Sequence, residues 1–193
     1  MQNNIILLDN MDSFTYNLVD QLRTLGHHVL IYRNHINVNV ILKKLKNVKN
    51  PILVLSPGPG NPEDAGCMIK LIEKVKSKIP VIGICLGHQA IIKSYGGEIT
   101  SANEILHGKA SLIKHDEKEM FFNISNPFTV ARYHSLIGTK IPNTLVINSF
   151  FKNIVMSVRN NTDRICGFQF HPESIITTKG TFFLERVIEW CNL

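Results

Sequence analysis

The first half of the chain alternates short apolar runs with amphipathic stretches. Four runs rich in Ile, Leu and Val are typical of buried strands: residues 4–9, 28–33, 51–56 and 81–85. Between and after them, apolar residues recur at helical spacing, which predicts four helices: residues 13–25, 38–45, 66–78 and 86–95. Asp12 or Ser13 is the expected N-cap of the first helix, and Gly26 is expected to end it. This order predicts a doubly wound, mostly parallel α/β sheet with helices on both faces.

The pattern changes after residue 97, where short strand candidates follow one another with few helices between them. They cover residues 109–115, 128–135, 144–150, 154–160 and 165–171. We expect these segments to extend the sheet as antiparallel strands, and a helix over 181–191 to close the chain. No low-complexity linker divides the sequence, so residues 1–193 are predicted to form one domain.

The composition is that of an ordinary globular protein. Of 193 residues, 44% are hydrophobic, and no apolar run approaches the roughly 18 residues of a membrane span. The N-terminal residues are interpreted as the first strand and not as a signal peptide, so we expect a cytoplasmic protein. The net charge is +6, but its Lys and Arg residues are scattered. The one dense basic run, Lys43 to Lys49, is interpreted as the solvated face of a helix and not as a nucleic-acid site.

Four cysteines occur, without a C-x-x-C pair and without a Cys/His cluster of zinc-like spacing. No metal site is therefore expected, and in a reducing compartment the cysteines would be free thiols. Cys67, Cys166 and Cys191 are interpreted as small buried hydrophobic residues. Cys85 has neighbours that favour a different interpretation.

Cys85 lies in the motif Gly-Ile-Cys-Leu-Gly, where a predicted strand meets a predicted helix. This is the context of a nucleophile elbow. Gly83 and Gly87 permit a tight turn, because a Cβ at either position would collide with neighbouring backbone. The turn places the thiol at a helix N-terminus, where unpaired N–H groups and the helix dipole favour the thiolate. Cys85 is therefore the candidate nucleophile, with an inert buried cysteine as the alternative.

A nucleophilic cysteine needs a base, and His171 and Glu173 follow the last predicted strand in the motif GFQFHPES. Positions i and i+2 of an extended chain point to the same side, so the carboxylate can orient the imidazole and stabilise its cation. Alone, the pair would be interpreted as a surface His–Glu contact. Combined with the elbow, it predicts a Cys-His-Glu triad.

A stiff loop, SPGPG, follows the third predicted strand and lacks the Lys-Ser/Thr of a phosphate-binding P-loop. Its glycine N–H groups can approach a ligand closely, which suits an oxyanion hole. The expected donors are the N–H groups of Gly58 and of Leu86, the residue after the nucleophile. A rigid turn that binds nothing is the alternative.

Other candidate residues are interpreted as structural. The segment Asp9 to Asn17 follows the first strand, at the sheet edge where open α/β folds bind ligands. Its two acids could suggest a metal or phospho-acceptor site, but helix capping explains Asp12 and Ser13. His134 is expected to be a rim or strand histidine. His88 lies only three residues beyond the candidate nucleophile on the same helix, and we do not predict that it is the base.

The elbow GICLGHQ, the loop SPGPG and the terminal GFQFHPES, in this order, resemble the motifs of the class I glutamine amidotransferases. The resemblance covers essentially the whole chain and implies the family's flavodoxin-like fold. It also implies that Cys85, His171 and Glu173 hydrolyse glutamine through a γ-glutamyl thioester, without a cofactor or metal in this chain. The residues that the resemblance places against glutamine are Gly58, Pro59, Gly60, Gln89, Ser135 and Leu136.

Within that family, the segments LLDNMDSFTYNL, ILHGK and ARYHSL resemble the chorismate-using branch. Ammonia must reach its acceptor unprotonated through a dry path, and the amidotransferase domain takes up all 193 residues. The resemblance therefore implies a separate chorismate-binding synthase subunit that carries Mg²⁺, in a heterotetramer of two large and two small subunits. We hypothesise that Asp9 to Asn17 and Leu106 to Lys109 lie near that interface.

The product of the complex stays open at this stage. Similarity favours anthranilate, with p-aminobenzoate as the alternative, because the synthase subunit decides between them. Two other classes of function are weaker candidates. A stand-alone cysteine hydrolase would use the same triad without a partner, and a nucleotide-binding module is disfavoured because no G-x-G-x-x-G motif follows the first strand.

Overall fold

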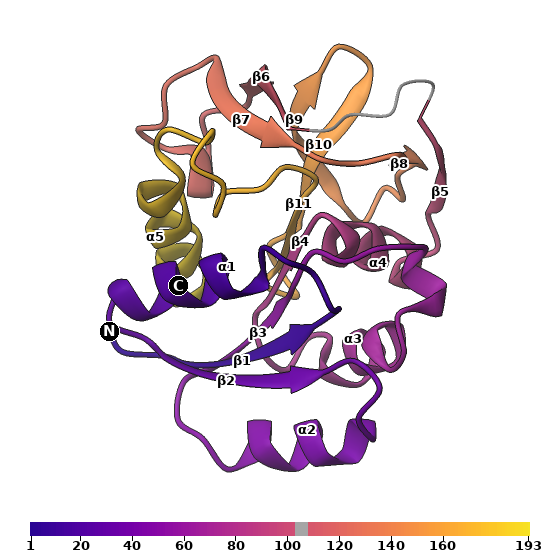
Figure 1. Ribbon diagram of the computed structural model, residues 1–193, viewed down its shortest axis with the longest axis vertical. Coiled ribbons are helices and arrows are strands. Elements are labelled where there is room, and N and C mark those ends of the chain that lie inside the picture. Colours follow the sequence, from indigo (N-terminus) through magenta and orange to yellow (C-terminus); the bar gives the residue numbers. More distant parts are fainter. Residues whose placement is uncertain (103–107) are drawn as a thin grey trace.

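A nine-stranded sheet runs through the part of the chain that the computed structural model describes, residues 1–102 and 108–193 (Figure 1). Its strand order is β2-β1-β3-β4-β11-β10-β9-β6-β7. The strands of this sheet are β1 (Asn4–Asp9), β2 (His28–Arg33), β3 (Pro51–Leu55), β4 (Val81–Ile84), β6 (Lys109–His115), β7 (Phe128–Arg132), β9 (Val146–Phe151), β10 (Ile154–Asn160) and β11 (Ile165–Phe168).

Helices pack on both faces of the sheet. They are α1 (Thr15–Thr24), α2 (Val38–Lys46), α3 (Met68–Val75), α4 (Leu86–Ser94) and α5 (Gly180–Cys191), with short 3-10 turns η1 (Pro62–Asp64) and η2 (Glu119–Phe121). Side chains of α1 and α5 share one buried cluster, and those of α2, α3 and α4 share a second one (Figure 1). The doubly wound α/β domain predicted from the sequence is therefore confirmed.

The residues of β1 show how one strand serves both clusters. Ile5 and Leu7 belong to the cluster under α1 and α5, whereas Ile6 and Leu8 belong to the cluster under α2 to α4. Successive side chains of a strand point to opposite faces, so a strand covered by helices on both faces must be apolar throughout. This is why the first predicted strand is a continuous apolar run.

The C-terminal half differs from the prediction in one important pairing. β10, β9, β6 and β7 are antiparallel to their neighbours, as expected, but β11 pairs parallel with β4. β11 therefore joins the two parts of the sheet: it pairs parallel with β4 on one side and antiparallel with β10 on the other. Its parallel direction could not be read from its own residues, because direction is set by which strand it joins.

A second sheet was not predicted. β5 (Glu98–Ser101) and β8 (Leu136–Lys140) pair antiparallel beside the main sheet. Both strands are short and largely exposed, so they lack the alternation of buried and exposed residues that marks a strand in a sequence. The loop that enters β8 nevertheless contributes to the candidate site.

Two helix boundaries also differ from the prediction. The N-cap of α1 is Phe14, not Asp12 or Ser13. Oδ1 of Asp12 instead accepts the N–H of Phe14 at 2.8 Å, in a turn that precedes the helix. Gly26 has φ +87° and follows the helix, as predicted. α3 is shorter than the range 66–78, since Lys76 leaves helical backbone angles directly after Val75.

Six aromatic rings meet under α5. Phe183 is fully buried, and its ring centroid lies 4.9–5.6 Å from the centroids of four other rings, those of Phe121, Phe128, Phe168 and Phe170. The ring of His115 stacks on that of Phe121 at 4.6 Å. Tilted and edge-on aromatic pairs are favourable beyond the apolar area that they bury. The cluster fixes α5, and with it the segment that leads into α5 from β11.

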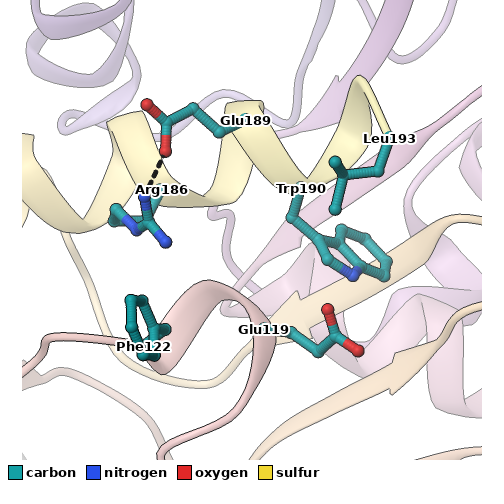
Figure 2. Close-up of a pocket in the computed structure, with 6 residues that line it drawn as sticks. All are labelled: Glu119, Phe122, Arg186, Glu189, Trp190 and Leu193. Atoms are coloured by element: carbon teal, nitrogen blue, oxygen red, sulfur yellow. Dashed lines mark hydrogen bonds and ion pairs between the residues drawn. The ribbon is translucent and has the colours of Figure 1, made fainter.

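The C-terminal end of α5 packs against η2 around an open pocket lined by Glu119, Phe122, Arg186, Glu189, Trp190 and Leu193 (Figure 2). Arg186 forms an ion pair with Glu189 at 2.5 Å, and its guanidinium lies 5.7 Å from the centroid of the Phe122 ring. None of these residues contributes to the candidate site. Among the described residues, no helix combines the length and the apolar character that crossing a membrane requires.

Phe183→Ala is expected to lower the free energy of unfolding by about 3–5 kcal/mol, because it leaves a cavity among four rings. Phe182→Ala is the matched control: Phe182 is 42% exposed on the same helix, and its truncation should cost about 0.5 kcal/mol or less. Urea unfolding of both variants measures the difference. Equal losses would contradict the packing described for α5.

Candidate active site

Cys85 is the single residue between β4, which ends at Ile84, and α4, which begins at Leu86. Its backbone angles are φ +51° and ψ −99°, a strained conformation for a residue with a Cβ, of the kind that costs about 1–3 kcal/mol. Such strain is typical of a nucleophile elbow, where the side chain must leave the sheet at its carboxyl edge. The backbone N–H of Cys85 donates to the carbonyl oxygen of Phe168 at 2.8 Å, which ties the turn to β11.

The two glycines around Cys85 are needed for the close approach that the sequence predicted. A Cβ on Gly83 would lie 2.5 Å from the backbone of Gly87, and a Cβ on Gly87 would lie 2.6 Å from the carbonyl oxygen of Leu55. Neither separation is tolerated, so α4 can start this close to β3 and β4 only with glycine at both positions.

The parallel pairing of β4 with β11 brings the predicted base to the predicted nucleophile. In the register of the two strands, Ile84 lies beside Phe168. The next residues, Cys85 and Gln169, therefore leave the sheet at the same edge, and His171 follows two positions later. Nε2 of Gln169 lies 3.6 Å from Sγ of Cys85.

His171 and Glu173 form a buried pair. Nδ1 of His171 lies 2.7 Å from Oε1 of Glu173, and the two residues are only 2% and 3% exposed. Burial acts to lower the pKa of His171, but the carboxylate of Glu173, followed by the adjacent Cys85 side chain, outweighs it, and the pKa lies well above its usual range. Nε2 of His171 is buried and makes no hydrogen bond of ordinary geometry within the described residues. The pair therefore has the properties of a base held in one orientation, with one ring nitrogen left for chemistry.

The backbone around His171 is fixed by its neighbours. Its N–H donates to the carbonyl oxygen of Ala131 at 3.0 Å, and its own carbonyl oxygen accepts the hydroxyl of Thr177 at 2.6 Å. That hydroxyl in turn accepts the N–H of Ala131. A Cβ on Gly180 would lie 1.8 Å from the carbonyl oxygen of Pro172, so the first residue of α5 packs directly on the segment. The imidazole is thus placed by β7, by α5 and by the turn between β11 and α5.

Two aromatic rings that the sequence analysis did not single out contact His171. The centroid of Phe14 lies 5.7 Å from that of the imidazole, and the centroid of Tyr133 lies 5.1 Å from it, both in edge-on geometry. The carbonyl oxygen of Tyr133 is also 3.9 Å from Sγ of Cys85. The motifs DSFTYN and ARYHS contain these residues, but only the folded chain brings them together.

Gly58 comes close to Leu86, as an oxyanion hole requires. A Cβ on Gly58 would lie 2.8 Å from Cδ2 of Leu86 and 2.6 Å from Cβ of Asn10. Asn10 fixes the start of this loop, since its side-chain amide donates to the carbonyl oxygen of Ser56 at 2.9 Å and its backbone N–H donates to the Ser56 hydroxyl. The loop that carries Gly58 therefore packs against Leu86, the residue that follows Cys85.

The residues expected to contact glutamine fall into two groups. Gln89 is buried, and its side-chain Nε2 donates to the carbonyl oxygen of Leu136 at 3.2 Å, so these two residues lie side by side. Pro59, Gly60 and Ser135 lie on exposed loops, and the structure gives them no contact with Cys85.

Asp9 serves the backbone and not a ligand. Its carboxylate oxygen Oδ1 accepts the N–H of Met11 at 2.9 Å and the hydroxyl of Thr15 at 3.0 Å, so it shapes the entry to α1. Within the described residues, no three His, Cys, Asp or Glu side chains gather closely enough to hold a metal ion.

The remaining histidines of this region are buried and neutral. Burial lowers the pKa of His88 to about 4. Burial and the charge of Arg132 lower the pKa of His134 to about 3. His134 was expected on a rim or strand, but it is 4% exposed, because its two ring nitrogens bond to Arg132 and to the carbonyl oxygen of Leu136. Neither residue is charged near neutral pH, whereas the pKa of His171 is shifted in the opposite direction.

Comparison with known proteins gives a consistent result. The sequence model described as "Glutamine amidotransferase class-I" matches residues 6–190. The chain is 62% identical over 190 residues to anthranilate synthase component 2 of Buchnera aphidicola subsp. Schizaphis graminum, covering 98% of this chain and 97% of that protein. It is 54% identical over 187 residues to the component 2 of Vibrio parahaemolyticus, covering 97% and 95%.

Among solved structures, the fold matches that of a protein from Thermoplasma acidophilum described as a GMP synthase subunit. The TM-score is 0.86 at 24% sequence identity, over 100% of this chain and 95% of the other. The fold likeness, the family match and the relatives agree with one another, and the chain belongs to the class I glutamine amidotransferase family.

Proposed function

We propose that this chain is the glutamine amidotransferase subunit of an anthranilate synthase, which supplies ammonia for anthranilate in tryptophan biosynthesis. The observation that carries the chemistry is the strained Cys85 elbow beside the buried His171–Glu173 pair. The relatives at 54–62% identity that are named anthranilate synthase component 2 support the choice of complex.

In the proposed reaction, the Sγ thiolate of Cys85 attacks the side-chain amide carbon of glutamine. In this proposal, the N–H groups of Gly58 and Leu86 stabilise the negative charge that develops on the carbonyl oxygen. The close packing of Gly58 against the Leu86 side chain supports this assignment. The imidazolium of His171 gives its proton to the departing nitrogen, so ammonia leaves and a γ-glutamyl thioester remains on Cys85. Neutral His171 then takes a proton from water, and the hydroxide so formed attacks the thioester carbon and displaces the Cys85 thiolate. Glutamate leaves, its new carboxyl group loses its proton to solvent, and the thiolate and imidazolium are restored.

Glu173 keeps His171 in the form that this sequence needs. Its carboxylate accepts from Nδ1, which leaves Nε2 as the nitrogen that exchanges protons with sulfur, ammonia and water. The raised pKa of His171 favours the imidazolium, and a positive charge beside sulfur stabilises a thiolate relative to a thiol.

Ammonia released into water near neutral pH becomes ammonium, which is not a nucleophile, so the proposal requires a partner that receives it directly. We propose a chorismate-binding component 1 as that partner, in a complex of two large and two small subunits in the cytoplasm. Mg²⁺ would belong to that partner, and this chain would hold no cofactor. A partner that makes aminodeoxychorismate on the way to p-aminobenzoate is the alternative, and the aromatic product formed with the native partner decides between them.

The segment Asp9 to Asn17 supports an interface beside the site. Met11 is 59% exposed and Tyr16 is 67% exposed, so this segment presents two large apolar side chains near Phe14 in the sequence, and Phe14 contacts His171. Of the second expected interface segment, Leu106 to Lys109, positions 106 and 107 lie outside the described residues.

Cys85→Ser is expected to lower the glutaminase rate by at least about 10³-fold, because a hydroxyl is a far weaker nucleophile than a thiolate. Cys67→Ser is the control and should keep the wild-type rate, because burial raises the pKa of Cys67 and holds it as a thiol. A glutamine-like electrophile should label the wild type at Cys85 alone. Equal labelling of Cys67, or no label, would rule out the proposed nucleophile.

Glu173→Gln is expected to lower the pKa of His171, because it removes the carboxylate that stabilises the imidazolium. NMR titration of ¹³C-labelled histidine measures this pKa directly. Folding raises the pKa of His171 above the ordinary value of 6.5, so the stabilising effect is complete below about pH 6.5 and is lost as pH rises through the folded value. The variant should lack this part of the pH dependence of unfolding.

The control for that experiment is Glu185→Gln, which removes an exposed carboxylate of α5. It should leave the titration of His171 unchanged. An unchanged titration in Glu173→Gln as well would show that the carboxylate does not act on the imidazole.

Tyr16→Glu is expected to weaken binding of the synthase subunit by at least about tenfold, because it buries an unpaired charge in place of an aromatic contact. Val40→Glu places the same charge at a position on α2 that is 46% exposed, and it should leave the affinity unchanged. Calorimetric titration with the purified partner measures both affinities. Wild-type affinity in Tyr16→Glu would remove this segment from the interface.

A further inference from the structure

A continuous chain of hydrogen bonds leads to Cys85, the proposed nucleophile. Nε of Arg132 lies 3.1 Å from Nε2 of His134, and Nδ1 of His134 lies 3.2 Å from the carbonyl oxygen of Leu136. Nε2 of Gln89 lies 3.2 Å from the same oxygen and 3.3 Å from Oε1 of Gln169. The chain ends where Nε2 of Gln169 lies 3.6 Å from Sγ of Cys85. Its members, in order, are Arg132, His134, Leu136, Gln89, Gln169 and Cys85.

The chemistry of the Leu136 carbonyl fixes the direction of the bonds on one side. A carbonyl oxygen only accepts, so the atom of Gln89 that faces it must be the amide nitrogen. The second N–H of that nitrogen needs an acceptor, so Gln169 must turn its oxygen toward Gln89. The amide nitrogen of Gln169 is thereby left facing Sγ of Cys85. Each assignment follows from the one before it. Reversing Gln89 would set its oxygen against the Leu136 carbonyl oxygen, and reversing Gln169 would set two amide nitrogens against each other.

The other side of the chain fixes a histidine tautomer. Nε of Arg132 can only donate, so Nε2 of His134 must accept, and the proton of the neutral ring sits on Nδ1. That proton points to the Leu136 carbonyl, which then accepts from both His134 and Gln89. The low pKa of His134, about 3, keeps the ring in this neutral form at any ordinary pH.

We propose that Gln169 is a further catalytic residue, which donates a hydrogen bond to the Cys85 sulfur and positions the Gln89 amide so that its oxygen is presented to an N–H donor of glutamine. The inference rests on the proposed function and deepens it. It assigns a role to a residue of the GFQFHPES motif that is fully buried and whose side chain, among the described residues, forms hydrogen bonds only within this network.

The Gln169 side chain performs both roles, because its nitrogen faces Cys85 and its oxygen faces Gln89. An N–H aimed at sulfur stabilises the charged thiolate more than the neutral thiol, because a hydrogen bond to an ionised acceptor is the stronger one. Gln89 uses both amide hydrogens within the protein, and within the described residues its oxygen makes no hydrogen bond. A fixed, unused acceptor is suited to recognise the ammonium or carboxamide N–H groups of glutamine.

Two variants of Gln169 separate the two halves. Gln169→Glu keeps an oxygen for Gln89 but replaces the donor to sulfur with a carboxylate oxygen. Gln169→Met keeps the length of the side chain and loses both bonds. Iodoacetamide alkylation of Cys85 as a function of pH, followed by peptide mass spectrometry, reports on the sulfur, and KM for glutamine in the complex with the synthase subunit reports on Gln89.

In Gln169→Glu, the midpoint of the alkylation profile should rise by about one pH unit, because a negative charge faces the thiolate, while KM stays within about threefold of wild type. In Gln169→Met, KM should rise about tenfold for the lost hydrogen bond. The double variant Gln89→Met/Gln169→Met should have a KM no higher than Gln89→Met alone, because both residues act through one amide. Gln2→Glu, which adds the same charge at an exposed position, should leave the midpoint unchanged.

The inference would be overturned if the midpoint of the alkylation profile were unchanged in Gln169→Glu. It would also be overturned if the increases in KM of the two single variants multiplied in the double variant. A merely structural role would lower the unfolding temperature and kcat without moving the midpoint. Should Gln169→Met fail to fold, Gln169→Glu differs from wild type by one group and carries the test alone. A wild-type protein without glutaminase activity would defeat the proposed function instead, and the alkylation profiles would still decide the contact between Gln169 and Cys85.

Discussion

Parallel pairing between β4 and β11 joins two parts of the chain that are far apart in sequence, and the candidate site exists only where they meet. The register that sets Ile84 beside Phe168 makes Cys85 and Gln169 the next residues on neighbouring strands, with His171 just beyond. The hydrogen bond from the Cys85 N–H to the Phe168 carbonyl continues that pairing into the turn. A slip of two residues along this pair would separate thiol from imidazole by more than about 6 Å, given the rise of a strand.

The strain at Cys85 is maintained by packing on every side of the turn. The left-handed φ of Cys85 persists because α4 starts against β3 and β4, which the missing side chains of Gly83 and Gly87 permit. On the opposite side, Thr177 and Gly180 hold the segment that carries His171. The candidate nucleophile and the candidate base are thus fixed by different helices, α4 and α5, which lie on opposite faces of the sheet (Figure 1).

Sequence alone predicts the parts of this molecule whose signals are local. The continuous apolar run of β1 and the pattern around Cys85 specify a buried strand and an elbow without knowledge of the fold. The parallel direction of β11 and the sheet of β5 and β8 were not predictable, because pairing depends on distant partners and these strands lack alternation. Phe14, Tyr133 and Gln169 escaped notice for the same reason, since an aromatic ring or an amide shows its role only through its neighbours.

The central claim is that glutamine is opened by covalent attack of Cys85, with His171 moving the protons. Rapid acid quenching of the enzyme during turnover of ¹³C-labelled glutamine, followed by peptide mass spectrometry, tests it with the natural substrate. The account predicts a labelled γ-glutamyl group on the peptide that contains Cys85 and on no other cysteine peptide. Continued release of glutamate with no adduct on Cys85, or with the adduct on Cys67, Cys166 or Cys191, would contradict it.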